Sequence, residues 1–142
     1  DHASVTGGFE GLASGESAAV SGGWSNEAWG RRSCIAGGAD NFAAGWESAI
    51  LGGRENDVGT DGEDACVSGG RGHFANAFAA SITGGRDNDV TGHYGSVTGG
   101  RSNHVAPDPV PMSAGCATIS GGYDWRLEDQ HDWRGGTYFS DD

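Results

Sequence analysis

Lysine is absent from this 142-residue chain, and proline, cysteine and methionine are rare. All eight basic residues are arginines against 20 acidic residues, so the formal net charge is −12 and phosphate backbones would be repelled. No apolar run approaches the length of a membrane-spanning helix. These absences exclude nucleic acid as a partner and exclude a membrane span. The acidic, lysine-free composition fits a secreted or salt-exposed setting, and we expect an extracellular or cell-surface location. The start at Asp1 predicts a processed or excised segment.

Sequence motifs for catalysis are also absent. There is no GxSxG, HExxH, Walker loop or CxxCH, and the histidines share no spacing that suits a metal site. We therefore expect a non-enzymatic protein.

Nine Gly-Gly pairs dominate what the sequence does contain. They begin at residues 7, 22, 37, 52, 69, 84, 99, 121 and 135, most of them 15 residues apart. A period of this length is too short for a helical repeat and indicates a β-solenoid, in which each repeat forms one coil. The fold prediction is an all-β, single-stack parallel β-solenoid of about eight coils over residues 1–122, with a Pro-rich insertion at 106–117 and an aromatic, acidic cap or joint at 123–142.

Two positions of the repeat predict the core. We number the positions of each coil from Ser4, the first residue of the first coil. Position ten carries small apolar residues, mostly alanine and valine, as an opposing wall. Position two is always β-branched, which predicts a short strand whose side chains stack inside the coil. These core residues are Val5, Val20, Ile35, Ile50, Val67, Ile82, Val97 and Ile119.

Position eight is mostly asparagine, with His73 in one coil. Stacked amides can form hydrogen bonds along the axis of a solenoid, as in cross-β ladders. We expect a structural ladder here, with a row of ligand-binding amides as the alternative. Its members are Asn26, Asn41, Asn56, Asn88 and Asn103.

Arginines and aromatic residues supply the candidate interface. Four of the eight arginines share position six. Glu55, Asp57, Asp87 and Asp89 lie within three residues of these arginines, close enough in sequence to form an ion-pair stripe. The aromatic residues favour a contact with a sister chain, and a glycan surface is the alternative. The interface candidates are Trp24, Trp29, Trp46, Arg54, Arg71, Arg86, Arg101, Trp125, Trp133, Tyr138 and Phe139.

Three acids crowd the two-residue insertion of the fourth coil. Asp61, Glu63 and Asp64 are candidate oxygen ligands for a calcium ion, and a solvated acidic bulge is the alternative. The cysteines lack zinc-site spacing. Cys34 and Cys66 share position one two coils apart, roughly 10 Å at the spacing of β-strands, which is too far for a disulfide. Cys116 lies in the insertion at 106–117, and the extra length of that segment could bring it close enough to Cys66 for a disulfide.

The repeat resembles the head repeats of YadA-like trimeric autotransporter adhesins, and the segment from Ser96 to Asn103 is among the clearest copies. The resemblance covers residues 4 to about 122. It implies a left-handed β-roll that trimerises and adheres to host or matrix molecules. We expect a homo-oligomer with a possible host, matrix or glycan ligand. The alternatives are a subunit of an extracellular filament and a calcium-stabilised solenoid.

Overall fold

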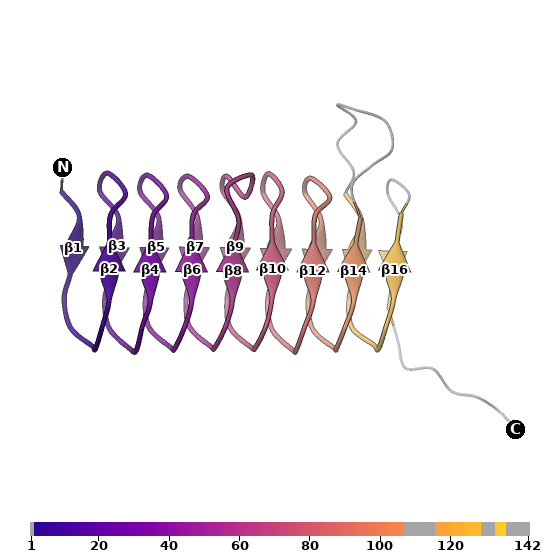
Figure 1. Ribbon diagram of the computed structural model, residues 1–142. Helices are drawn as coiled ribbons and strands as arrows, with labels where there is room; N and C mark the ends of the chain where they lie inside the picture. The colour runs from indigo at the N-terminus through magenta and orange to yellow at the C-terminus, as the bar shows by residue number, and fades with distance from the viewer. Residues whose placement is uncertain (1, 107–115, 129–132, 136–142) are drawn as a thin grey trace, which may run out of the picture.

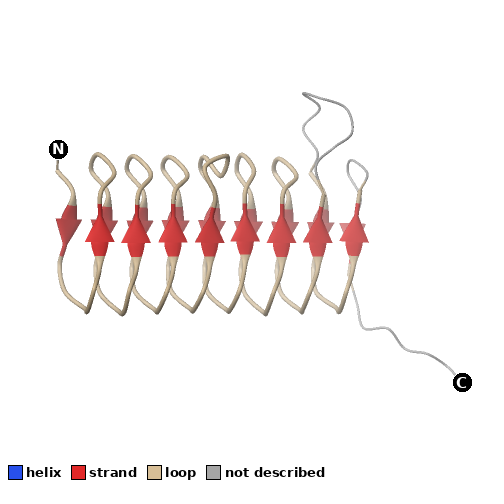
Figure 2. Ribbon diagram, viewed as in Figure 1, coloured by secondary structure: helices blue, strands red, loops and turns tan. Residues whose placement is uncertain are grey.

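Each coil contributes two short strands that run in opposite directions on either side of a Gly-Gly corner (Figures 1 and 2). Each strand pairs in parallel with the equivalent strands of the neighbouring coils. The computed structural model describes residues 2–106, 116–128 and 133–135, and within them the chain is all-β. The predicted β-solenoid is confirmed. Equivalent residues of successive coils pair in register, as Val20 does with Val5 and Ile35.

The strands form two sheets, one on each side of the stack. The first sheet contains β1 (Ser4–Val5), β3 (Ala19–Val20), β5 (Cys34–Ile35), β7 (Ala49–Ile50), β9 (Cys66–Val67), β11 (Ser81–Ile82), β13 (Ser96–Val97), β15 (Thr118–Ile119) and β17 (Trp133–Arg134). The second contains β2 (Leu12–Ala13), β4 (Glu27–Ala28), β6 (Phe42–Ala43), β8 (Asp57–Val58), β10 (Phe74–Ala75), β12 (Asp89–Val90), β14 (His104–Val105) and β16 (Arg126–Leu127).

The core lies between the two sheets and contains side chains from three positions of the repeat. Position two is buried from Val20 to Ile119, and position ten is buried from Ala28 to Leu127. Position fifteen adds a row of small residues that the sequence did not single out, including Ser33, whose hydroxyl donates a hydrogen bond to the Gly30 carbonyl at 2.8 Å. The small residues at position fifteen and the mostly small residues at position ten allow the walls of a thin coil to approach closely.

Val5 departs from the predicted core because its side chain is 47% exposed. It belongs to β1, which pairs only with β3, so no coil covers it on the other side. The end of a stack exposes the residue type that every interior coil buries.

The corner after each first strand requires glycine at position five. Gly38 has φ of 94°, a left-handed conformation that side chains rarely adopt, and a Cβ there would lie 2.2 Å from the carbonyl oxygen of Gly53. Residues with short polar or acidic side chains, such as Asp40 with φ of 56°, take a second left-handed conformation two positions later.

The stack extends beyond residue 122, the predicted end of the repeat domain. Leu127 in β16 is buried against the core, and β17 pairs with β15. After residue 122 the sequence matches the repeat less well, although the described residues still form strands of the stack. The Pro-rich stretch 107–115 and the tail residues Tyr138 and Phe139 lie outside the described residues.

Candidate functional surface

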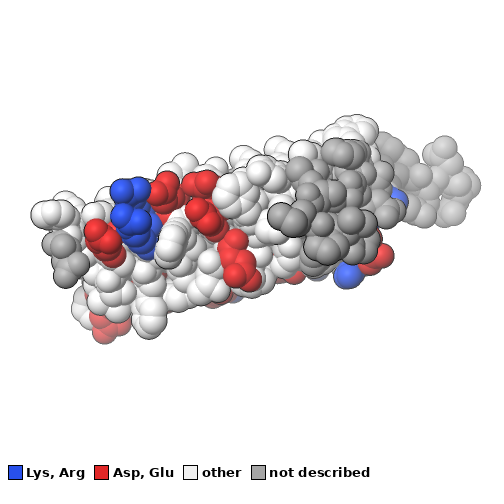
Figure 3. Space-filling model, turned by 90° about the horizontal axis from the view of Figure 1, so that it is seen from above, with Lys and Arg blue, Asp and Glu red and all other residues white. Residues whose placement is uncertain are grey.

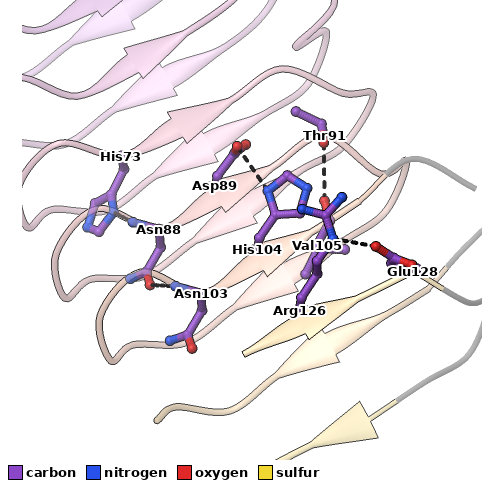
Figure 4. A network of polar contacts seen from close by, with 9 residues as sticks. All are labelled: His73, Asn88, Asp89, Thr91, Asn103, His104, Val105, Arg126 and Glu128. Atoms are coloured by element: carbon purple, nitrogen blue, oxygen red, sulfur yellow. Dashed lines mark hydrogen bonds and ion pairs between the residues drawn. The ribbon is translucent and has the colours of Figure 1, made fainter. Parts of the chain in front are cut away.

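The position-eight amides form a buried ladder that connects each coil to the next. The Oδ1 atom of each asparagine accepts a hydrogen bond from the backbone N–H of the next ladder residue, as Asn88 does from Asn103 at 3.0 Å (Figure 4). Each Nδ2 donates to two glycine carbonyls, one in its own corner and one in the next coil, as Asn26 does to Gly22 and Gly38. The amides therefore bind the backbone of two corners, and with exposures of 0–1% they are not accessible to a ligand.

His73 is the irregular member of the ladder. Its Nδ1 accepts a hydrogen bond from the backbone N–H of Asn88 at 3.1 Å, as an asparagine Oδ1 would (Figure 4). Its Nε2 atom is buried and makes no hydrogen bond of acceptable geometry within the described residues, although the Gly85 carbonyl lies near it. Burial lowers the pKa of His73, while its backbone neighbours and the Asp87 carboxylate act in the opposite direction.

We expect His73→Asn to stabilise the protein and to reduce its sensitivity to mild acid. The amide would regain the two glycine contacts of its neighbours, and satisfying a buried donor is worth about 1–3 kcal/mol. Because the pKa of folded His73 is lowered, the unfolded chain takes up a proton near the ordinary value of about 6.5 and the folded chain only at lower pH. Stability contributed by His73 is thus complete above about pH 6.5 and falls as the pH drops toward the lowered pKa.

The measurement is urea unfolding of the wild type and His73→Asn between about pH 7.5 and 5. His93→Asn is the matched control, because His93 is exposed on a turn. The difference in free energy of unfolding between wild type and His73→Asn should widen on acidification. A difference that stays constant with pH would contradict the lowered pKa.

Position six forms a row along one edge of the solenoid, and its described members are exposed except Ala39, which is half-buried. Parallel bridges connect each member to the next, from Phe9 and Trp24 through the four arginines to Tyr123. At one end the Phe9 and Trp24 rings stack with centroids 4.3 Å apart. At the other end the Arg101 guanidinium lies 5.1 Å from the centroid of the Tyr123 ring.

The predicted ion-pair stripe is largely not formed within the described residues. Arg71 pairs with Glu55 at 3.2 Å, but Arg54, Arg86 and Arg101 have no carboxylate within 4.0 Å among the described residues. Asp57 and Asp89 lie on the outer face of the second sheet instead, since residues three positions from an arginine have already turned the corner. The row therefore presents guanidinium groups to solvent.

The outer face of the first sheet carries no charge over its first eight strands. It is formed by positions one and three, which contain only small residues and one leucine, Leu51. Cys34 and Cys66 lie half-buried on this face, and burial, with a smaller contribution from Cys66, raises the pKa of the Cys34 thiol. All three cysteines are free, so the Cys66–Cys116 pairing that the sequence left open is not formed.

The outer face of the second sheet is more polar. Asp89 Oδ2 lies 3.0 Å from His104 Nδ1 in the next coil (Figure 4). Burial raises the pKa of Asp57, and one oxygen of each of Asp57 and Asp89 is buried without a hydrogen-bond partner in the described part of the chain. A hollow of about 280 Å³ on this side is lined by Ser25, Glu27, Asp40, Asn41 and Phe42.

The turns opposite the Gly-Gly corners carry ion pairs that run along the axis. Arg31 pairs with Glu16 at 3.3 Å and Arg32 with Glu47 at 2.7 Å. Viewed from this edge, basic atoms lie between acidic ones (Figure 3). Each pair joins side chains of neighbouring coils, and exposed pairs of this kind contribute little stability.

The calcium prediction for the acidic insertion is not supported by the geometry. Asp61, Glu63 and Asp64 are exposed, and residues 2–106, 116–128 and 133–135 contain no group of three or more His, Cys, Asp or Glu side chains that could hold a metal ion. The backbone of the loop is instead bound to its neighbours, since Asp61 N–H donates to Asn76 Oδ1 and Asp64 N–H to the Trp46 carbonyl.

The aromatic interface candidates differ in exposure. Trp24, Trp29 and Trp46 are 52–57% exposed in the second and third coils. Trp125 is partly buried against the core, and the Arg134 guanidinium lies 5.1 Å from the centroid of its ring. Trp133 is 67% exposed, with its Nε1 donating to the Ser120 hydroxyl at 3.0 Å.

Comparison with known proteins adds no family: no protein-family model matches the chain, and no curated sequence matches it. No helix that could cross a membrane occurs in the part of the chain that the structure describes.

Proposed function

We propose that this chain is a non-enzymatic structural or adhesive β-solenoid of the cell surface or extracellular space, which self-associates and most resembles a trimeric adhesin head. The observation that carries the proposal is the distribution of exposed apolar side chains. Among the described residues, seven of the ten large exposed hydrophobic residues belong to the first four coils: Val5, Phe9, Leu12, Trp24, Trp29, Trp46 and Leu51. Exposed apolar side chains that are contiguous, as the stacked Phe9 and Trp24 rings are, are typical of a protein–protein contact.

The thin core supports the same proposal. Its largest fully buried side chains are isoleucine, leucine, valine and one histidine, and most of its other members are alanines. A small core buries little apolar surface per ordered residue. Association with further copies would bury additional apolar surface that a single coil stack leaves exposed. The repeat similarity to YadA-like heads supports a trimer in particular.

A filament subunit is the second candidate. Within the described residues, β1 and β2 are the outermost strands of the two sheets at one end of the stack. Open sheet edges can pair with strands of another molecule. Electron microscopy distinguishes the two candidates, since discrete trimers support the head and continuous fibres support the filament.

We expect the wild-type protein to sediment as an oligomer at micromolar concentration. The double variant Trp29→Ser/Trp46→Ser should shift the distribution toward monomer, because it removes two large exposed apolar side chains. Tyr94→Ser is the control, since Tyr94 is 45% exposed but lies outside the first four coils. A folded wild-type monomer in sedimentation velocity would refute self-association.

A further inference from the structure

The glycine at position four has no structural explanation within the coil. Gly52, Gly69, Gly84 and Gly99 do not have the positive φ of the next glycine. A Cβ built on any of them would meet no atom within 4 Å. Position five is the opposite case, since a Cβ on Gly85 would lie 2.1 Å from the Gly100 carbonyl oxygen. A glycine without such a requirement leaves the backbone bare, and close approach of a ligand to the backbone is one reason for a glycine at such a place.

The residues beside these glycines are polar and regularly arranged. In the fifth to seventh coils an exposed hydroxyl precedes the glycine pair and an exposed arginine follows it. We call this surface the glycine–arginine strip and define it as Ser68, Gly69, Arg71, Thr83, Gly84, Arg86, Thr98, Gly99 and Arg101.

The charge around the strip favours an anionic ligand on one side. Toward the first sheet the arginines border only glycine, serine and threonine. On the other side, position seven is uncharged next to two of the three arginines, at Gly72 and Ser102, and acidic at Asp87. In a chain with a net charge of −12, Arg86 and Arg101 have no carboxylate within 4.0 Å among the described residues, whereas Arg71 is paired with Glu55 at 3.2 Å. A ligand carboxylate would compete with Glu55 for Arg71.

The spacing of the arginines selects the class of anion. The coils repeat at about 4.8 Å, so the strip offers one guanidinium per coil. Double-stranded DNA carries a charge about every 1.7 Å, which the strip would not neutralise. A chain of acidic sugars carries at most about one carboxylate per ring, a far lower charge density. Guanidinium groups bind carboxylates in bidentate fashion, and serine and threonine hydroxyls suit sugar hydroxyls.

We propose that the glycine–arginine strip binds a linear acidic polysaccharide that lies parallel to the solenoid axis. The carboxylates contact Arg71, Arg86 and Arg101, and the sugar rings lie over the bare backbone of the position-four glycines. Tyr123, 64% exposed at the end of the row, offers a face for a further ring. The inference names a ligand for the adhesive part of the proposed function and rests on that part.

The test is calorimetric titration of the full chain with polygalacturonate oligosaccharides, at low and at high salt. Wild type should bind, and the affinity should fall as salt rises. Arg71→Gln/Arg86→Gln should bind at least about tenfold more weakly, because two charge-assisted contacts are lost. The matched control, Arg31→Gln/Arg32→Gln, makes the same change of charge at the opposite turns and should bind within about twofold of wild type. Equal weakening by the two double variants would overturn the inference.

A second variant tests the glycines. Gly69→Ala/Gly84→Ala/Gly99→Ala should fold as the wild type does, since each added methyl group enters open space, yet it should weaken binding at least about tenfold by holding the ligand off the backbone. Unchanged affinity in this variant, or equally tight binding of duplex DNA by wild type, would overturn the inference.

Sedimentation of the same variants separates this inference from the proposed self-association. The strip variants should keep the wild-type oligomeric state, and Trp29→Ser/Trp46→Ser should keep the wild-type affinity for polygalacturonate. A glycine variant that dissociates the oligomer, in a protein that does not bind polygalacturonate, would assign the strip to a second copy of the chain and overturn the inference.

Discussion

Ile82→Asp should destabilise the coil stack by roughly 3–5 kcal/mol, a large fraction of the stability of a typical domain. The Ile82 side chain is fully buried, and its strand pairs in register with Val67 on one side and Val97 on the other. A carboxylate there would be unpaired among apolar side chains. Because each coil contacts only its neighbours, the defect should also uncouple the coils on either side of it.

The matched control for this variant is Thr83→Asp. Thr83 follows Ile82 directly but is exposed on the outer face of the first sheet, so the same change of charge should alter the free energy of unfolding by less than about 0.5 kcal/mol. Thermal and urea unfolding followed by circular dichroism measure both variants. Equal unfolding midpoints for Ile82→Asp and wild type would mean that position two does not carry the core.

Gly38→Ala should destabilise the protein by at least about 3 kcal/mol, although it adds a single methyl group. The φ of Gly38 is 94°, and the new Cβ would lie 2.2 Å from the Gly53 carbonyl oxygen and 2.6 Å from the Nδ2 atom of Asn41. The methyl group would therefore displace both the next coil and a member of the amide ladder. Strain and the loss of buried hydrogen bonds act in the same direction.

Gly37→Ala is the control one residue earlier in the chain. Its Cβ would meet no atom within 4 Å, and its φ is not in the left-handed region, so we expect no loss of stability and a gain of up to about 1 kcal/mol from the less flexible unfolded chain. The difference between the two unfolding midpoints is the measurement. Similar losses in Gly37→Ala and Gly38→Ala would contradict the assignment of the left-handed corner to position five.

The repeat period and the alternation within each coil determined the architecture from sequence alone. Parallel coils bring identical positions of the repeat together, so a β-branched residue at position two every 15 residues indicates both the strand and the side that faces inward. The burial of Ile35, Ile50 and Ile82 follows from this pattern. The same pattern does not predict that Val5 is exposed, because this depends on β1 being the outermost described strand of its sheet.

The tertiary structure decided what each side chain contacts. The sequence placed asparagine on a ladder, but the backbone geometry of the corner directs its amide to the Gly22 and Gly38 carbonyls. The three acids of the insertion are close in sequence, but in the described structure they do not form a group of three that could hold a metal ion. The two glycines of each pair look alike in sequence, and their roles differ because φ and the distance to the next coil are properties of the folded backbone.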